Sequence, residues 1–180
     1  DTFRSSVAAR AIHKYGKVII NDISAGELDP LIVDVAAEHD VPYVAMHMKG
    51  DPRTMQSMTD YRDIVAEVVD YFRERTAQLR ERGVRRIVVD PGFGFAKTLE
   101  QNYELLRGLH RLAELGYPVL AGVSRKSMIY KLLGTTPAEA LNGTTALHWE
   151  CLRQGAAILR AHDTREAVEV VRMFDQFMQA

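Results

Sequence analysis

Short runs of apolar residues alternate along the chain with longer segments in which apolar residues recur every three or four positions. The short runs lack regular polar positions, which is typical of parallel strands buried on both faces. They predict strands near residues 17–21, 42–47, 86–90, 118–122 and 157–161. The longer segments predict helices near residues 4–15, 30–39, 60–82, 101–115, 137–154 and 164–178. This alternation predicts an α/β fold with a parallel sheet.

Glycines follow several predicted helices and precede the next strand; they are Gly16, Gly83, Gly116 and Gly155. Glycine ends helices because it adopts the left-handed conformation without a side-chain clash. No low-complexity tract or linker interrupts the pattern, so we expect a single domain over residues 1–180. Repeated β/α units leave two architectures open, a doubly wound open sheet or part of a (β/α)8 barrel. Both bind ligands at the carboxyl ends of their strands.

Polar residues follow the predicted strands at their carboxyl ends. Val88 and Val89 lead to Asp90, and the loop after it reads Pro-Gly-Phe-Gly-Phe. A buried charge is costly unless it has a partner, although Asp-Pro-Gly is also ordinary turn chemistry. The same arrangement recurs at other strands, which favours a ligand site over a set of turns. The polar residues concerned are Asn21, Asp22, His47, Asp90, Ser124, Arg125, Lys126, Arg160 and His162.

Composition narrows the classes of protein to which the chain can belong. Of its 180 residues 47% are hydrophobic, which is typical of a globular domain. Its 23 basic and 24 acidic residues give a net charge of -1, so we expect no nucleic-acid partner. No apolar run approaches the ~18 residues of a membrane span, so we expect no membrane partner. The lone Cys151 excludes an intramolecular disulfide and suits a reducing compartment, so we expect a cytoplasmic protein.

Several segments together resemble the dihydropteroate synthase family, in the same order and at suitable spacing. They read INDISAG, AMHMKGDPRTMQ, VVDPGFGFAKTLEQNYELL, VLAGVSRKSMI, NGTTAL and LRAHDTREAVE. The most specific combination is DPGFGF with GVSRKS and the final Arg-x-His. The resemblance covers essentially the whole chain. It implies a (β/α)8 TIM barrel, of which this chain would supply about the last five β/α units.

By this resemblance Asp1 ends the third strand of the barrel. The first two strands and their catalytic loops would then lie outside the sequence, and we expect the isolated chain to turn over poorly. The implied activity belongs to folate biosynthesis. Family members join 6-hydroxymethyl-7,8-dihydropterin pyrophosphate to 4-aminobenzoate, which forms 7,8-dihydropteroate and releases pyrophosphate.

The resemblance also assigns residues to the pterin. Asp90 would anchor the ring by accepting hydrogen bonds from its N–H groups, and Asn21 would be its partner. Asp1 would be a further pterin contact, and its carboxylate could stabilise positive charge as the leaving group departs. Met46 and Phe95 would form apolar walls for the flat ring.

Three glycines would let the backbone pass close to the ring, where any Cβ would intrude; they are Gly92, Gly94 and Gly122.

Lys126, by the same resemblance, bridges the pterin and 4-aminobenzoate regions. Ser127 would lie near the aminobenzoate carboxylate, helped by the amino end of the following helix. Arg160 and His162 lie two apart on the last predicted strand and therefore face the same side. Arginine forks onto phosphate oxygens and histidine can donate, so this pair suits the pyrophosphate. We therefore expect Asp1, Lys126, Arg160 and His162 to be catalytic.

The family uses Mg²⁺ with the pyrophosphate. The resemblance places the protein ligand of this ion outside the sequence, and no His/Cys ligand spacing occurs here. We therefore expect no metal ligand among these residues. The resemblance further implies a homodimer and makes sulfonamides candidate inhibitors.

Simpler interpretations of some residues remain open. Asp22 suits a helix cap or a turn better than a ligand contact, and His47 suits a core position. Arg160 could form a structural ion pair with Asp163.

Two other functions also remain open. A pterin-binding methyltransferase of the same superfamily would share Asp90 and Asn21 but would not need the Arg160 and His162 pair. A non-catalytic pterin-binding domain is the third possibility.

Overall fold

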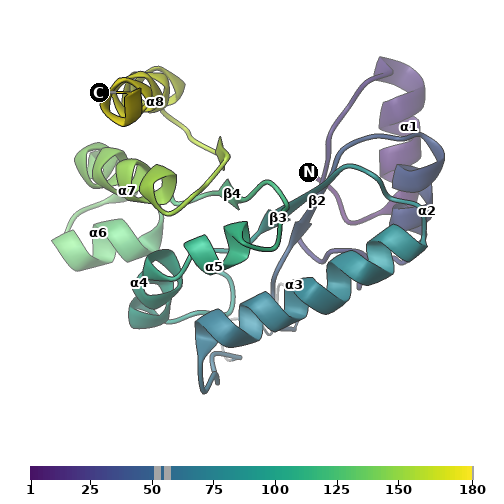
Figure 1. Ribbon diagram of the computed structural model, residues 1–180, viewed down its shortest axis with the longest axis horizontal. Coiled ribbons are helices and arrows are strands. Elements are labelled where there is room, and N and C mark those ends of the chain that lie inside the picture. The colour runs from purple at the N-terminus through teal and green to yellow at the C-terminus, as the bar shows by residue number, and fades with distance from the viewer. Residues whose placement is uncertain (51–53, 55–57, 180) are drawn as a thin grey trace.

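A curved parallel sheet forms the inside of the molecule in the computed structural model, which describes residues 1–50, 54 and 58–179 (Figure 1). Its strands are β1 (Ile20–Asp22), β2 (Tyr43–Met46), β3 (Ile87–Asp90), β4 (Leu120–Ala121) and β5 (Ile158–Leu159). β1, β2 and β3 pair in parallel, as do β4 and β5. A parallel bridge between Val89 and Val119 joins the two groups. The strands, each near its predicted position, therefore lie side by side in chain order.

The strand order decides between the two architectures left open by the sequence. A doubly wound sheet reverses its order at a switch point and carries helices on both faces. Here the order of the described strands never reverses, and the helices lie on the outer side of the arc (Figure 1). The arrangement is an arc of a β/α barrel, in which the carboxyl ends of the strands open on one side.

The helices form the outer layer of the arc. They are α1 (Ser5–Tyr15), α2 (Leu31–Glu38), α3 (Ile64–Glu81), α4 (Leu99–Arg107), α5 (His110–Ala113), α6 (Ser127–Leu133), the short 3-10 helix η2 (Pro137–Glu139), α7 (Leu141–Arg153) and α8 (Thr164–Gln179). No helix in the part of the chain that the structure describes is long and apolar enough to cross a membrane.

Two helix predictions were wrong in detail. The predicted helix 101–115 is two helices, α4 and α5, which separate at Gly108. A Cβ at Gly108 would come within 2.6 Å of Val65 Cγ1, so glycine allows α3 to pack closely there. The sequence pattern also does not predict α6, because its 7 residues are too few for helical periodicity to stand out.

Helix ends follow local chemistry. The glycines predicted to end helices have positive φ angles, namely 71° at Gly16, 91° at Gly83, 80° at Gly116 and 90° at Gly155. α3 begins later than predicted because Asp63 caps it, accepting a hydrogen bond from the Ala66 amide at 2.9 Å.

Strand register sorts side chains between two faces of the sheet. Ile20, Tyr43 and Ile87 stand next to one another and point into the hydrophobic core under the helices. Side chains alternate along a strand, so residues one or three positions further on face the inside of the arc. Asn21 and Asp90 therefore share the inner face, and this places two predicted site residues together.

Candidate active site

Asp90 ends β3 on the inner face and is fully buried. Its Oδ1 accepts a hydrogen bond from the Gly92 amide at 2.8 Å. Its Oδ2 lies 3.0 Å from Nη1 of Arg160, but the geometry of that ion pair is not that of a hydrogen bond. Oδ2 consequently has no hydrogen-bond partner among the described residues. A buried carboxylate oxygen of this kind is suited to an N–H donor from a ligand.

A chain of polar contacts connects Asp90 to the first residue of the sequence. The Asn21 amide donates to Oδ1 of Asp1 at 2.5 Å. Nη1 of Arg160 donates to Oδ1 of Asn21 at 3.5 Å and reaches Asp90 on its other side. Two acidic residues, one amide and one arginine that are distant in sequence thus meet at the carboxyl ends of β1, β3 and β5.

Lys126 approaches the same region from the loop after β4. Burial lowers its pKa to about 8, with Asp90 acting in the opposite direction and Arg160 adding to the decrease. Its amine donates to the Phe93 carbonyl and lies 5.0 Å from the centre of the Phe95 ring. Lys126 is therefore a partly buried lysine beside the aromatic ring of Phe95.

The central cavity has a volume of about 260 Å³. It is lined by Asp1, Gly122, Ser124, Lys126, Arg160, Ala161 and His162. A neighbouring cavity of about 320 Å³, the aromatic cavity, is lined by Phe93, Gly94, Phe95, Arg125, Lys126, Ser127, Tyr130 and Pro137. Lys126 lines both, so the structure places this amine between two adjoining cavities.

His162 is oriented by Ser124. Its backbone amide donates to the Ser124 hydroxyl oxygen at 3.1 Å, and its Nδ1 lies 3.0 Å from the same oxygen. When that hydroxyl donates its proton to Nδ1, the ring proton resides on Nε2. The imidazole then offers an N–H donor at the central cavity.

Met46 is the register partner of Asp90 in the pairing of β2 with β3, so its side chain shares the inner face with Asn21 and Asp90. It is buried and lies near Gly92. Like Asn21 and Asp90, it lines neither the central nor the aromatic cavity.

The structure gives Gly92 a reason that does not involve a ligand. A Cβ at Gly92 would come within 2.1 Å of the His47 carbonyl oxygen, and its φ is 69°. Gly92 is therefore required by backbone already in place. A Cβ at Gly122 would come within 2.5 Å of Nη2 of Arg160, but this atom is the far end of a flexible side chain, so the contact alone does not require glycine.

Arg125 has a connecting role that sequence reasoning missed. Its guanidinium forms two hydrogen bonds to Asp163, at 2.9 and 2.7 Å, and another to the Pro137 carbonyl at 2.7 Å. The alternative that paired Arg160 with Asp163 is wrong, because Asp163 belongs to Arg125. Arg125 has a φ of 53° and links the loop after β4 to the loop after β5.

Lys97 was also missed. It closes the glycine-rich loop after Asp90, and its amine is buried under that loop. The sequence feature that could have identified Lys97 is its place directly after a glycine-rich loop that begins with Asp90.

Two of the simpler interpretations are confirmed. Asp22 is fully buried on the helix side and accepts hydrogen bonds from the Ser24 amide and hydroxyl, the Gly26 amide and the Tyr43 hydroxyl, at 2.6 to 2.8 Å. His47 is a core residue whose ring packs edge-on against Tyr71, with centroids 4.9 Å apart.

A metal centre is not assigned to the residues that the structure describes, because they hold no group of three or more His, Cys, Asp or Glu side chains suited to an ion. Part of the AMHMKGDPRTMQ segment, residues 51–53, 55 and 56, lies outside the described residues.

Comparison with known proteins matches residues 1–162 to the pterin binding enzyme family. The dihydropteroate synthase of Synechocystis sp. is 42% identical over 178 residues, which cover 97% of this chain and 61% of that protein. That of Escherichia coli is 41% identical over 182 residues, covering 100% and 64%. The chain thus spans less than two thirds of the length of these relatives.

Solved structures agree with the sequence comparison. Dihydropteroate synthase from Thermus thermophilus matches with a TM-score of 0.93 and 40% identity, covering 98% of this chain and 70% of that one. The enzyme from Yersinia pestis, solved with a sulfonamide drug complex, matches with a TM-score of 0.95 and 34% identity, covering 100% and 66%. The prediction that the chain forms part of a (β/α)8 barrel is confirmed.

Proposed function

The chain belongs to the pterin-binding enzyme family, and from this premise we propose that it carries the substrate site of a dihydropteroate synthase. The proposed reaction joins 6-hydroxymethyl-7,8-dihydropterin pyrophosphate to 4-aminobenzoate. The amine nitrogen of aminobenzoate forms a bond to the exocyclic methylene carbon of the pterin. The bond from that carbon to the pyrophosphate oxygen breaks, the amine loses a proton, and 7,8-dihydropteroate and pyrophosphate leave.

One observation carries the proposal, namely the buried Oδ2 of Asp90 without a hydrogen-bond donor among the described residues. A pterin presents neighbouring N–H groups along one edge, and a carboxylate accepts two such bonds well. Asn21 and Asp1 stand beside it and would meet other polar atoms of the ring. A fully satisfied aspartate would give no such support.

The two adjoining cavities suit the two substrates. We assign the pyrophosphate to Arg160 and His162 at the central cavity, because an arginine fork and an imidazole N–H both bind phosphate oxygens. We assign 4-aminobenzoate to the aromatic cavity, where Phe95 offers an apolar wall and Ser127 a polar end. Lys126 would stand between the reacting partners.

Similar proteins bind the same ligands. The Thermus thermophilus relative has been solved in complex with 6HMPPP and with 4-aminobenzoate. The dihydropteroate synthase of Xanthomonas albilineans has been solved with 7,8-dihydropteroate. These ligands support the synthase over a pterin-binding methyltransferase or a non-catalytic pterin-binding domain, neither of which needs the aminobenzoate cavity. Sulfonamides are proposed inhibitors on the same ground.

We keep Mg²⁺ as a cofactor in the proposal, but the described residues do not form a site for it. The ion would be held mainly through pyrophosphate oxygens, and no step is assigned to it. We also propose a cytoplasmic location, supported by the single, free and buried Cys151, and one domain over residues 1–180.

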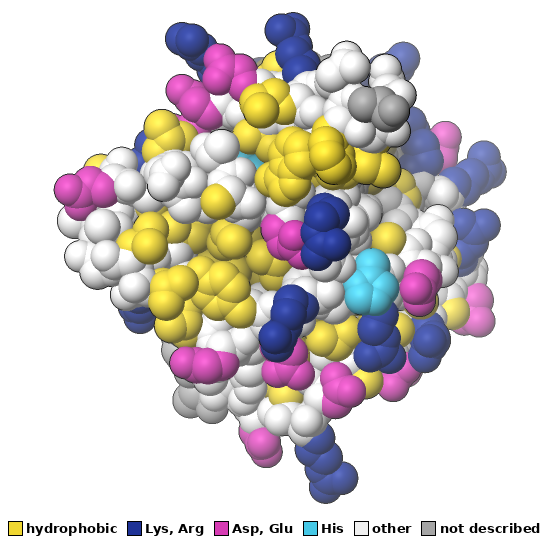
Figure 2. Space-filling model, turned by 60° about the vertical axis from the view of Figure 1, so that its left-hand side comes forward, with side chains coloured by type: hydrophobic (Ala, Val, Ile, Leu, Met, Phe, Trp, Pro, Cys, Tyr) yellow, Lys and Arg dark blue, Asp and Glu magenta, His cyan; other side chains and the backbone are white. Residues whose placement is uncertain are grey.

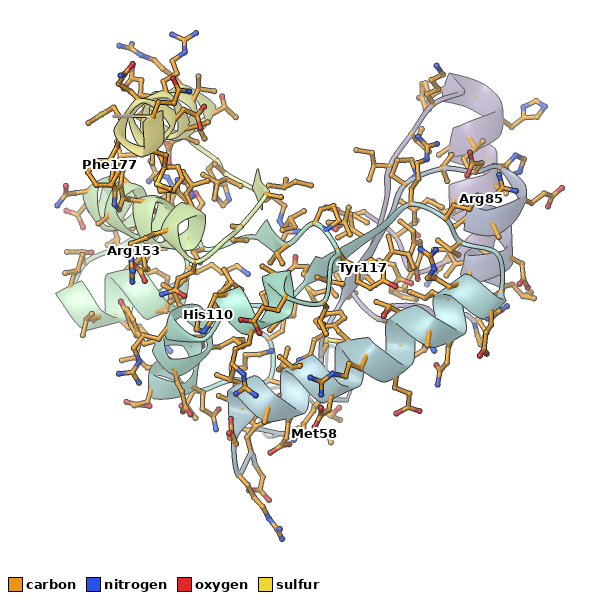
Figure 3. The ribbon with its side chains drawn as sticks, viewed as in Figure 1. Met58, Arg85, His110, Tyr117, Arg153 and Phe177 are labelled. Carbon is orange, nitrogen blue, oxygen red and sulfur yellow. The ribbon has the colours of Figure 1, made fainter. Side chains whose placement is uncertain are left out.

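A homodimer is proposed on the surface of α6, α7 and α8. Hydrophobic side chains gather in patches on this side of the molecule (Figure 2). Phe177 lies on α8 in the outer helical layer (Figure 3) and is 66% exposed. Met173 and Met178, also on α8, are exposed to a similar extent. Sedimentation velocity checks this proposal, since Phe177→Glu should shift a dimer towards monomer while the exposed Arg165→Ala should not.

The site assignment is tested by titrating two ligands, the pterin pyrophosphate and the free pterin alcohol. The titrations use the 180-residue chain and a version extended to the length of the Escherichia coli relative. Arg160→Ala should weaken the pyrophosphate ester about tenfold to a hundredfold and the alcohol much less, because the phosphate contact is lost. Arg165→Ala, which removes an exposed arginine of α8, is the control. Equal losses for both ligands would mean that Arg160 only holds Asp90, and the phosphate assignment would fail.

A further inference from the structure

Arg125 and Asp163 form an ion pair that joins the loop after β4 to the loop after β5. Nε and Nη2 of Arg125 donate to the two carboxylate oxygens of Asp163, at 2.9 and 2.7 Å. The two side chains are only 21% and 18% exposed, so solvent screens this pair less than it screens an exposed pair. Two parallel hydrogen bonds fix the direction of the contact as well as its length. The pair therefore sets the position of one loop relative to the other.

The other donors of Arg125 are also used within the protein. Nη1 donates to the carbonyls of Pro137, at 2.7 Å, and Ala138, at 2.5 Å, in the short helix η2. A guanidinium has five N–H donors, and four of them are thus occupied. The Arg125 backbone amide donates to the Thr144 hydroxyl of α7 at 3.0 Å. These contacts indicate that Arg125 holds segments of the chain together.

The backbone of Arg125 depends on these contacts. Its φ is 53°, in the left-handed region that is uncommon for residues other than glycine. Such a conformation persists where surrounding contacts maintain it. The two neighbours of Arg125 in sequence, Ser124 and Lys126, both line the central cavity. Maintaining the turn at Arg125 therefore keeps these two side chains at the cavity.

The loop after β5 carries the other half of the arrangement. Asp163 follows His162, which lines the central cavity, but Asp163 itself lines neither the central nor the aromatic cavity. A second link joins the same two loops, because the His162 amide donates to the Ser124 hydroxyl oxygen at 3.1 Å. The linked loops thus carry Lys126 and Ser127 on one side and His162 on the other.

We propose that Arg125 and Asp163 are positioning residues, whose ion pair holds the 4-aminobenzoate contacts Lys126 and Ser127 at a fixed place relative to the pyrophosphate contact His162. This inference rests on the proposed function, because it uses the two substrate assignments made there. The bond-forming step needs the aminobenzoate amine close to the carbon that loses pyrophosphate. Small displacements of the groups that position two reactants slow such a step strongly.

The pterin contacts provide an internal comparison. Asn21 and Asp90, which are assigned to the pterin, belong to β1 and β3. Their positions are set by the pairing of these strands with β2. Loss of the ion pair should therefore weaken the binding of pyrophosphate and 4-aminobenzoate and leave the binding of the free pterin alcohol nearly unchanged. A general loss of structure would weaken all three.

Calorimetric titration of three ligands tests this selectivity, namely inorganic pyrophosphate, 4-aminobenzoate and 6-hydroxymethyl-7,8-dihydropterin. The titrations use the 180-residue chain and the version extended to the length of the Escherichia coli relative. Asp163→Asn keeps the shape of the side chain and removes its charge. It should weaken pyrophosphate and 4-aminobenzoate about threefold to tenfold each, because the link through Ser124 remains, and should change pterin affinity less than about twofold.

Arg82→Gln is the matched control. Arg82 also joins two elements through an aspartate, because it donates to Asp34 of α2 at 3.1 and 2.7 Å from the end of α3. It lines neither the central nor the aromatic cavity. This variant should bind all three ligands as wild type does.

A double-mutant cycle separates the ion pair from its two side chains. Arg125→Gln should give the same selective loss as Asp163→Asn. The double variant should lose no more affinity than Arg125→Gln alone, because both changes remove one ion pair. Losses that add would show that the two side chains act separately, and would overturn the inference. If Arg125→Gln fails to fold, Arg125→Lys, which keeps the charge without the fork, replaces it in the cycle.

Three other results for Asp163→Asn would also overturn the inference. Equal losses for all three ligands would mean that the ion pair only stabilises the fold. Unchanged affinities would mean that it has no effect on the site. A loss confined to pyrophosphate or to 4-aminobenzoate would mean that the pair shapes one cavity and does not relate the two.

The proposed function fails separately. Absence of binding of these ligands by wild type would reject the function and the inference together. Binding of all three by wild type, with unchanged affinities in Asp163→Asn, would keep the function and reject only the positioning role.

Discussion

Two buried aspartates, one on each side of the sheet, show how the molecule separates structure from binding. Asp22 and Asp90 end strands β1 and β3, and neither is exposed. Asp22 faces the helices and receives four hydrogen bonds from its own loop and from Tyr43. Asp90 faces the inside of the arc and has one hydrogen bond, from Gly92, while its second oxygen has none among the described residues.

The difference lies in what each carboxylate still needs. A buried charge with every acceptor position filled holds a loop and gains nothing from a ligand. A buried charge that is half satisfied retains an unmet requirement for a donor, which a ligand meets with a large gain because both groups are already removed from water. Burial and residue type are the same at both positions, so the contacts of the carboxylates separate the two roles. Asp22 has four hydrogen bonds, whereas Asp90 has one hydrogen bond and an ion pair with Arg160.

The largest loss of stability should come from substituting Asp22, the aspartate that faces the helices. Asp22→Ala leaves the Tyr43 hydroxyl and two loop amides without an acceptor, and should lower the free energy of unfolding by about 3 to 5 kcal/mol. Urea denaturation measures this loss. Asp34→Ala removes an exposed carboxylate paired with Arg82 and should cost less than about 1 kcal/mol. Similar losses in the two variants would show that the contacts of Asp22 contribute little.

Substituting Asp90, which faces the inside of the arc, should change ligand affinity more than stability. Asp90→Asn keeps an oxygen for the Gly92 amide and loses the ion pair with the half-exposed Arg160, so the free energy of unfolding should fall by about 1 to 2 kcal/mol, less than in Asp22→Ala. Pterin affinity should fall about tenfold to a hundredfold, since an amide presents N–H donors to the N–H donors of the ring. Calorimetry and urea denaturation of the same sample compare the two quantities. Unchanged affinity would remove the basis of the ligand assignment.

Lys97, another buried charged residue near Asp90, should make the free energy of unfolding depend on pH. Its pKa in the folded chain, about 7, lies below its ordinary value of 10.5, so between these values the unfolded chain binds more protons. Stability of wild type relative to Lys97→Met should therefore rise with pH across that window, by about 1 kcal/mol per pH unit. Denaturation midpoints at several pH values measure the slope. A relative stability that falls with pH would show that Lys97 is held charged.

The smallest effect should come from α4, the helix that follows the glycine-rich loop after Asp90. Thr98 and Gln101 form a capping box at the start of α4. Thr98→Ala should lower the free energy of unfolding by about 1 kcal/mol and leave pterin affinity unchanged. A large loss of affinity would mean that the position of α4 also shapes the glycine-rich loop after Asp90. Residues that stabilise the fold and residues that bind the ligand would then be less separate than proposed.

Much of the fold could be predicted because it depends on local chemistry. Apolar runs located the five strands of the described residues, and glycines at 16, 83, 116 and 155 marked helix ends as expected. The need for glycine at position 108, where α4 ends, could not be predicted, because the residue that a Cβ there would meet is Val65 of another helix. Among the predicted site residues, Asp90, Lys126, Arg160 and His162 were proposed partly from their places at strand ends, and the structure brings them near one another.

The roles of Lys97 and Arg125 were not predicted because their partners are distant in sequence. Lys97 binds His47, and Arg125 binds Asp163. No local pattern records such pairs. The same reason applies to Gly92, because the atom that a Cβ there would meet is the carbonyl oxygen of His47, just after β2.

The sequence by itself determined the order of strands and helices, the family resemblance and the polar residues at strand ends, because hydrophobic periodicity and turn chemistry act within a few residues. Only the tertiary structure decided which way those residues face. Strand register places Asn21 and Asp90 inside and Asp22 outside, and a shift of one residue would exchange them. The curvature of the sheet then brings Arg160 from the end of β5 to Asn21 and Asp90, a contact across 139 residues of chain in the case of Asn21.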